Sequence, residues 1–127
     1  MKRILAFLTA LLLLPGCSSS PSENGYRQVT TEEAISIMDE KDDYILLDVR
    51  TIDEYKEQHI PGAVCIPNKT IGSEEISELP DKSQLILVYC RSGNRSKQAA
   101  QKLADLGYTN IVEFGGIIDW TGETTSQ

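Results

Sequence analysis

Short apolar runs alternate with amphipathic segments through most of this chain. Runs such as residues 44–47 and 85–89, made of aliphatic residues and tyrosine, are typical of strands buried on both faces of a sheet. Five strands are predicted on this basis, at residues 26–29, 44–47, 63–66, 85–89 and 110–113. Strands separated by helices predict a parallel sheet covered on both faces, which is an α/β three-layer domain.

Two signals for a helix start lie between the predicted strands. Residues 30–33 and 51–54 both have a threonine followed three positions later by a glutamate, the pattern of a capping box. They predict one helix after Thr30 and a short helix from Thr51 to about Gln58. Three further segments are predicted to be helical: residues 74–79, residues 96–106 with Gly107 as the C-cap, and a terminal turn that carries Trp120.

The amino terminus has the pattern of an export leader. Lys2 and Arg3 supply positive charge, and residues 4–14 are an apolar stretch too short to span a bilayer as a mature helix. The ending Leu14-Pro15-Gly16-Cys17 resembles the lipobox of bacterial lipoproteins. That resemblance implies that Cys17 receives a diacylglyceryl thioether and becomes the new amino terminus after cleavage. An ordinary secretory signal cleaved nearby is the alternative.

Three regions are predicted from this pattern: a lipoprotein signal peptide at residues 1–16, a flexible tether at 17–25 and one folded domain at 26–127. The serine-rich stretch after Cys17 has no folding signal, which is why it is assigned to the tether. The lipobox resemblance implies that the domain is anchored to a membrane of the bacterial cell envelope and faces outside the cytoplasm.

Composition predicts a single hydrophobic core and argues against nucleic acid as a partner. Its 127 residues, 40% of them hydrophobic, are enough for a single domain. Loss of Lys2 and Arg3 with the leader would take the net charge from −7 to −9, so nucleic acid is not expected as a partner. With Cys17 lipidated, Cys65 and Cys90 form neither a disulfide framework nor a metal-binding spacing.

The most informative junction lies where the apolar run 85–89 ends on Cys90. A polar loop follows it at once: Arg91, Ser92, Gly93, Asn94, Arg95 and Ser96. Gly93 permits a positive φ and Asn94 tolerates one, so successive amides can point inward as an anion-binding nest at the start of a helix. Arg91 and Arg95 are expected to flank the same concavity. All these groups favour thiolate over thiol, so we expect a lowered pKa and a nucleophilic Cys90.

Other polar residues are expected near this loop because the carboxyl ends of parallel strands meet at one edge of a sheet. Asp48 follows the run 44–47, and it is interpreted either as a partner that orients Arg50 or an arginine of the Cys90 loop, or as a carboxylate at the entry to a helix. Arg50 is interpreted either as a residue that supports the active site or as part of a structural ion pair. His59 is interpreted as a hydrogen-bonded structural histidine. Cys65 is interpreted as a small core residue, with a resolving thiol for Cys90 as the alternative.

Four motifs, taken in order, resemble the single-domain rhodanese, or sulfurtransferase, family across roughly residues 27–120. They are 47–51 (Leu-Asp-Val-Arg-Thr), 54–55 with 59–63 (Glu-Tyr and His-Ile-Pro-Gly-Ala), 90–96 (Cys-Arg-Ser-Gly-Asn-Arg-Ser), and 115–117 (Gly-Gly-Ile) with Trp120. The resemblance implies a five-stranded parallel sheet. It also implies that Cys90 takes the outer sulfur of a donor such as thiosulfate as a persulfide and passes it to cyanide or a thiol. No cofactor or metal is required for that chemistry.

The partners implied are a small anionic sulfur donor, a thiol or protein-thiol acceptor and a membrane reached through the lipid anchor, with the protein itself a monomer. One alternative is a rhodanese-fold module that binds a partner or senses redox state without turnover. A second is a phosphatase or arsenate reductase. Phosphatases of this fold place five residues between the cysteine and the arginine, whereas four separate Cys90 from Arg95 and position 96 is serine.

Overall fold

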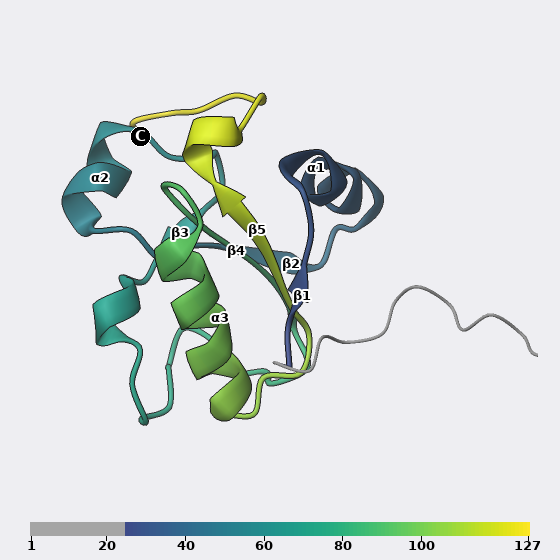
Figure 1. Ribbon diagram of the computed structural model, residues 1–127, viewed down its shortest axis with the longest axis vertical. Helices are drawn as coiled ribbons and strands as arrows, with labels where there is room; N and C mark the ends of the chain where they lie inside the picture. Colours follow the sequence, from purple (N-terminus) through teal and green to yellow (C-terminus); the bar gives the residue numbers. More distant parts are fainter. Residues whose placement is uncertain (1–24) are drawn as a thin grey trace, which may run out of the picture.

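A computed structural model describes residues 25–127. The predicted signal peptide, residues 1–16, and the predicted tether, residues 17–25, lie outside the described residues except for Gly25. The described part is an α/β domain in which helices cover both faces of one sheet, as the sequence predicts (Figure 1).

The sheet has five strands in the order β1-β5-β4-β2-β3, and every neighbouring pair is parallel. The strands are β1 (Arg27–Gln28), β2 (Tyr44–Asp48), β3 (Val64–Cys65), β4 (Leu85–Cys90) and β5 (Ile111–Gly116). The central strand β4 is buried from Ile86 to Cys90, in agreement with its unbroken apolar run. Strand β5 continues past the predicted end at Glu113 as far as Gly116.

Local sequence signals set the ends of several helices. The helices are α1 (Thr31–Glu40), α2 (Ile52–Glu57) and α3 (Asn94–Asp105). Thr51 and Glu54 form the predicted capping box of α2. Helix α3 ends in a Schellman motif, because the Gly107 N–H donates to the Ala104 carbonyl and the Tyr108 N–H to the Leu103 carbonyl. Gly107 has φ +99° there, so the predicted glycine ends the helix one position beyond the C-cap.

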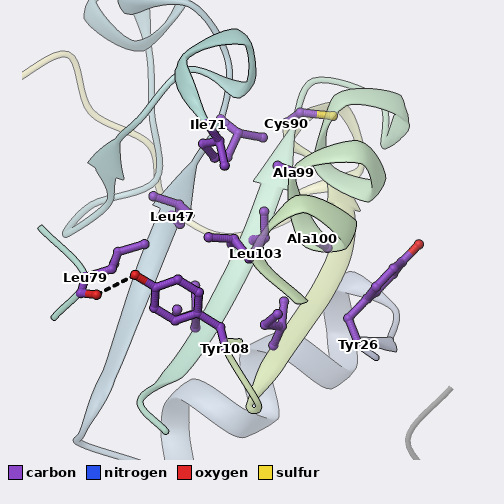
Figure 2. Close-up of a cluster of buried hydrophobic side chains, with 13 residues drawn as sticks. Tyr26, Leu47, Ile71, Leu79, Cys90, Ala99, Ala100, Leu103 and Tyr108 are labelled. Atoms are coloured by element: carbon purple, nitrogen blue, oxygen red, sulfur yellow. Dashed lines mark hydrogen bonds between the residues drawn. The ribbon is translucent and has the colours of Figure 1, made fainter. Parts of the chain in front are cut away.

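Two apolar clusters lie on opposite faces of the sheet. On one face, Ala99, Ala100 and Leu103 of α3 pack against the inward side chains of β2, β4 and β5, as Figure 2 shows. On the other face, Ala34 of α1 packs with Leu87 and other strand residues. Because side chains alternate along a strand, Cys90 faces α3, whereas Asp48 faces the side covered by α1 and α2.

The predicted helix over residues 74–79 is absent, so that prediction is wrong. The backbone makes one turn there, in which the Leu79 N–H donates to the Ile76 carbonyl at 3.0 Å. Residues 73–76 lack the capping box that starts the equally short α2, and Glu74 and Glu78 would repel one another one turn apart. A short 3-10 helix, η1 (Asn68–Thr70), lies in the preceding segment instead.

Candidate active site

The Cys90 thiol lies at the carboxyl end of β4, in contact with the loop that leads into α3. Its side chain is buried, with 1% of the residue exposed. The Gly93 N–H donates to Cys90 Sγ at 3.0 Å, and Ser96 Oγ lies 3.4 Å from the same sulfur. The Gly93 amide therefore points inward at this sulfur atom.

Burial and hydrogen bonding act on the Cys90 thiol in opposite directions. Burial raises its pKa, because a thiolate loses the solvation of water. Hydrogen bonds from the Ser96 side chain and from the backbone amides of Ser96, Gly93 and Ser92 lower it by stabilising the charged form. The hydrogen bonds outweigh burial, so the pKa of Cys90 lies below its ordinary value, in the predicted direction.

Glycines hold the loop in this shape from two sides. Gly93 has φ +113°, in the left-handed region, and it is the N-cap of α3 without any side-chain capping bond. Helix α3 therefore begins at Asn94, two residues earlier than predicted. On the β5 side, a Cβ at Gly116 would lie 1.9 Å from the Arg91 carbonyl oxygen and 2.5 Å from the Ser92 nitrogen. Only glycine permits this close approach of β5 to the loop.

Ser96 is buried beneath the loop, in the first turn of α3. Its hydroxyl lies 2.8 Å from Glu113 Oε2, and the same carboxylate oxygen accepts a hydrogen bond from the Gly115 N–H at 2.6 Å. Sequence reasoning placed Ser96 in the loop but missed Glu113. The available signal was an acidic residue at the end of the predicted strand 110–113, directly after the apolar pair Ile111 and Val112.

The two loop arginines have different surroundings. Arg95 makes a bidentate ion pair with Glu54 of α2, with N–O distances of 2.6 and 3.0 Å. The hydrogen bond from Arg95 holds the pKa of Glu54 at about 2. Arg91 is exposed, and no side-chain partner contacts it within residues 25–127. Of the two arginines expected to flank the loop, Arg91 therefore has no acidic partner within residues 25–127, whereas Glu54 neutralises the charge of Arg95.

Asp48 pairs with Arg50, the first of its two predicted partners. The two side chains are buried, and their closest atoms, Asp48 Oδ2 and Arg50 Nη2, are 2.6 Å apart. The same Arg50 nitrogen donates to the Gln58 carbonyl at 2.6 Å. This pair supports the segment between β2 and α2 and makes no contact with a loop arginine.

A groove of about 610 Å³ opens beside the loop, between α2 and the 3-10 helix η2 (Ile117–Asp119). Its walls comprise Arg50, Glu54, Glu57, Gln58, Arg91, Ile117 and Ile118. Arg91 is the unpaired cation of this groove, and Ile118 is one of the few exposed large apolar side chains in the described residues. The groove therefore has one unpaired cation and one exposed apolar side chain next to the Cys90 loop.

Within residues 25–127, the remaining predicted residues contribute no side-chain contact to Cys90 Sγ. Ser92 and Asn94 have exposed side chains, and Ser92 contributes through its backbone amide. His59 Nδ1 lies 2.7 Å from the Tyr55 carbonyl, and its ring stacks on Tyr55 at 3.7 Å, as expected of a structural histidine. Cys65 is a free, half-buried thiol at the end of β3.

Two family models match this chain. The model described as a rhodanese-like domain matches residues 30–123, and the model described as a prokaryotic membrane lipoprotein lipid attachment site matches residues 1–18. The second match agrees with the lipobox resemblance at Cys17. Within residues 25–127, no helix is long and apolar enough to cross a membrane.

Curated relatives and solved structures resemble the same region. The chain is 37% identical to thiosulfate sulfurtransferase PspE of Escherichia coli over 73 residues, which cover 58% of this chain and 70% of PspE. It is 39% identical to adenylyltransferase and sulfurtransferase UBA4 of Meyerozyma guilliermondii over 89 residues, which are 64% of this chain but 21% of that protein. The solved rhodanese-like domain of an Anabaena protein superimposes with a TM-score of 0.70 at 27% identity, covering 79% of both chains.

Proposed function

Because this chain belongs to the rhodanese-like domain family, we propose that it is a sulfurtransferase that carries sulfur on Cys90. The donor is a small anion with a sulfane sulfur, such as thiosulfate, and the acceptor is a thiol, a protein thiol or cyanide. The observation that carries this proposal is the position of Cys90 Sγ, buried at the end of β4 and 3.0 Å from the Gly93 N–H in a loop of inward amides.

The reaction is two successive displacements at sulfur. The Cys90 thiolate attacks the outer sulfur of thiosulfate, the sulfur–sulfur bond of the donor breaks, and sulfite leaves with the bonding electron pair. The product is a Cys90 persulfide anion. A thiolate or cyanide then attacks the terminal sulfur, takes it as a persulfide or thiocyanate, and returns Cys90 to the thiolate form. No external oxidant or reductant is needed.

The surrounding residues stabilise and attract negative charge. The amides of Ser92, Gly93 and Ser96 stabilise the anionic sulfur at each stage. Arg91 attracts the anionic donor into the groove, because its charge is not neutralised by another side chain within residues 25–127. Arg95 and Asn94 complete the loop at the start of α3, with Arg95 held by Glu54.

The lipid attachment match extends the proposal to location. Residues 1–16 act as the signal peptide, Cys17 carries the lipid and residues 17–25 form the tether. The domain of residues 26–127 then works as a monomer that is anchored in the bacterial cell envelope and faces outside the cytoplasm.

The Asp48–Arg50 ion pair has a supporting role, because it holds the segment that leads from β2 into α2.

Intact mass of the full chain before and after thiosulfate tests the proposal. We expect a gain of about 32 Da, one sulfur atom, that cyanide removes, that the Cys90→Ser variant lacks and that the Cys65→Ser variant keeps. A loss of two hydrogens that needs both cysteines would instead establish a Cys65–Cys90 disulfide and a redox role. No mass change of either kind would favour a binding module.

A further inference from the structure

A buried carboxylate lies beneath the Cys90 loop, and the proposed sulfur transfer does not use it. Glu113 of β5 is 2% exposed, on the face of the sheet that α3 covers. No cation pairs with it within residues 25–127. Two donors contact its Oε2 atom: the Gly115 N–H at 2.6 Å and the Ser96 hydroxyl at 2.8 Å. A charged group so deep in a core depends on these hydrogen bonds.

The Ser96 hydroxyl joins Glu113 to the Cys90 sulfur. It has one proton to donate and four acceptors within reach. The acceptors are Glu113 Oε2 at 2.8 Å, the Gly93 carbonyl at 3.0 Å, the Gly115 carbonyl at 3.3 Å and Cys90 Sγ at 3.4 Å. An ionised carboxylate at the shortest distance is the strongest of these acceptors. While Ser96 donates to Glu113, its oxygen can only accept a hydrogen bond from the Cys90 S–H group.

We propose that Glu113 is a positioning residue that acts through Ser96 and restrains the ionisation of Cys90; this rests on the proposed function of Cys90 as the sulfur carrier. When Cys90 ionises, its proton leaves to water and the Ser96 hydroxyl turns from Glu113 to the sulfur. Glu113 then retains only the Gly115 N–H. The two anions compete for a single proton, so each opposes the charge of the other.

Ser96 therefore differs from the other donors around the sulfur. The amides of Ser92 and Gly93 are part of the backbone, so they point at the sulfur in both protonation states. The Ser96 hydroxyl donates only when Glu113 gives it up. Thiolates are oxidised far more readily than thiols, so this restraint protects an exported Cys90 while no donor is bound.

Other charges near the sulfur come from different elements. Arg95 of α3 interacts with Cys90 electrostatically and is held by Glu54 of α2. The Asp48–Arg50 pair follows β2 and faces the other side of the sheet. Among the charged side chains of residues 25–127, only Glu113, from β5, is linked to Cys90 Sγ through one shared hydroxyl group.

The test is the rate of Cys90 alkylation by iodoacetamide in the full chain from pH 5 to pH 9, followed by peptide mass mapping. In Glu113→Gln, an amide of the same shape, we expect alkylation at pH 6 to accelerate about tenfold and the profile to move to lower pH. Glu113→Asn, a smaller amide, should move it in the same direction. Glu78→Gln, at an exposed carboxylate, should leave the profile unchanged.

A double-mutant cycle separates the Ser96 link from a direct effect of charge. In a Ser96→Ala background, Glu113→Gln should change the alkylation rate less than about twofold. The same acceleration in that background would overturn the role of Ser96. An unchanged profile in folded Glu113→Gln and Glu113→Asn, checked by thermal unfolding, would overturn the proposal as a whole. Alkylation needs no sulfur donor, so these outcomes do not depend on whether sulfur transfer itself is observed.

Discussion

Two thiols at the same edge of the sheet, Cys65 at the end of β3 and Cys90 at the end of β4, have opposite electrostatic surroundings. Burial raises the pKa of Cys65 to about 11, with a further contribution from the Asp48 carboxylate. Cys90 is the more deeply buried of the two, yet its pKa lies below the ordinary value. Burial alone therefore does not decide whether a thiol becomes a nucleophile.

The difference lies in what each sulfur meets. Cys65 Sγ lies 3.6 Å from the Arg50 carbonyl oxygen, an acceptor that can stabilise a thiol but not a thiolate. Cys90 Sγ meets backbone N–H groups and a hydroxyl from the loop and the first turn of α3. The comparison teaches that a strand end becomes a reactive site when the following loop turns its donors inward.

Removal of each thiol should give the largest contrast. Cys90→Ser is expected to lower thiosulfate:cyanide sulfur transfer at least about a thousandfold, because the group that carries the sulfur is lost. Cys65→Ser should stay within about twofold of the wild-type rate. Thiocyanate formation measures both. Equal loss of activity in the two variants would remove the distinction between the thiols.

The second-largest expected contrast is between the alkylation rates of the two thiols at neutral pH. With a pKa of about 11, Cys65 is a thiolate in roughly one molecule in ten thousand at pH 7. Iodoacetamide should therefore modify Cys90 at least about a hundredfold faster than Cys65. Raising the pH from 7 to 9 should accelerate Cys65 about a hundredfold and Cys90 much less. Peptide mass mapping gives the two rates, and similar rates at pH 7 would contradict the comparison.

A substitution at Gly116 should move Cys90 toward the behaviour of Cys65. The new Cβ would collide with the Arg91 carbonyl and the Ser92 nitrogen, so Gly116→Ala must displace one of the amides that stabilise the thiolate. We expect slower Cys90 alkylation at pH 7 and a loss of about 2–3 kcal/mol in the free energy of unfolding, measured in urea.

Gly72→Ala is the matched control for Gly116→Ala, because a Cβ there meets nothing within 4 Å. It should change the free energy of unfolding by less than about 0.5 kcal/mol. If Gly116→Ala left both the stability and the alkylation rate as they are in Gly72→Ala, the close approach of β5 would not hold the loop.

Loss of the Glu54–Arg95 ion pair should have the smallest effect, a small change in the free energy of unfolding. The pair is partly exposed, so Glu54→Gln should cost less than about 1 kcal/mol of unfolding free energy at pH 7. The folded pKa of Glu54, about 2, is below its usual 4.5, so this stabilisation is present above pH 4.5 and disappears as the pH falls through 2. The difference in unfolding free energy between wild type and Glu54→Gln, measured in urea, should therefore shrink as the pH is lowered from 4.5 toward 2. Glu57→Gln, on the same helix but unpaired, should show no such narrowing.

Elements with a strong local pattern were predicted well from the sequence. The buried strands β2 and β4, the capping box of α2 and the glycine that ends α3 each depend on neighbouring residues. The predicted start of α3 was two residues too late because its N-cap is Gly93, which has no side chain that could form a capping hydrogen bond. The helix expected over residues 74–79 does not form, although Ile76 and Leu79 pack against the core. The segment is short and lacks a capping box, so its local helical signal is weak.

The residues of the candidate site also fall into those that the sequence could locate and those that it could not. The Cys90 loop could be located because all its parts are consecutive. Glu54 and Glu113 could not, because Glu54 contacts Arg95 across 41 positions and Glu113 contacts Ser96 across 17. A residue that acts across such distances has no local pattern that indicates its partner.

The sequence by itself determined the α/β class, the family, and a thiol placed before a loop of potential donors. Apolar runs, glycine positions and motif order are properties of the chain that do not depend on its tertiary contacts. Only the tertiary structure decided which arginine keeps its charge free, which carboxylate is buried beneath Ser96, and why Cys65 and Cys90 differ. Those outcomes depend on how β5 and α2 pack against the loop. Packing brings charges and hydrogen-bond donors together from distant parts of the chain, and their distances set the electrostatics of each thiol.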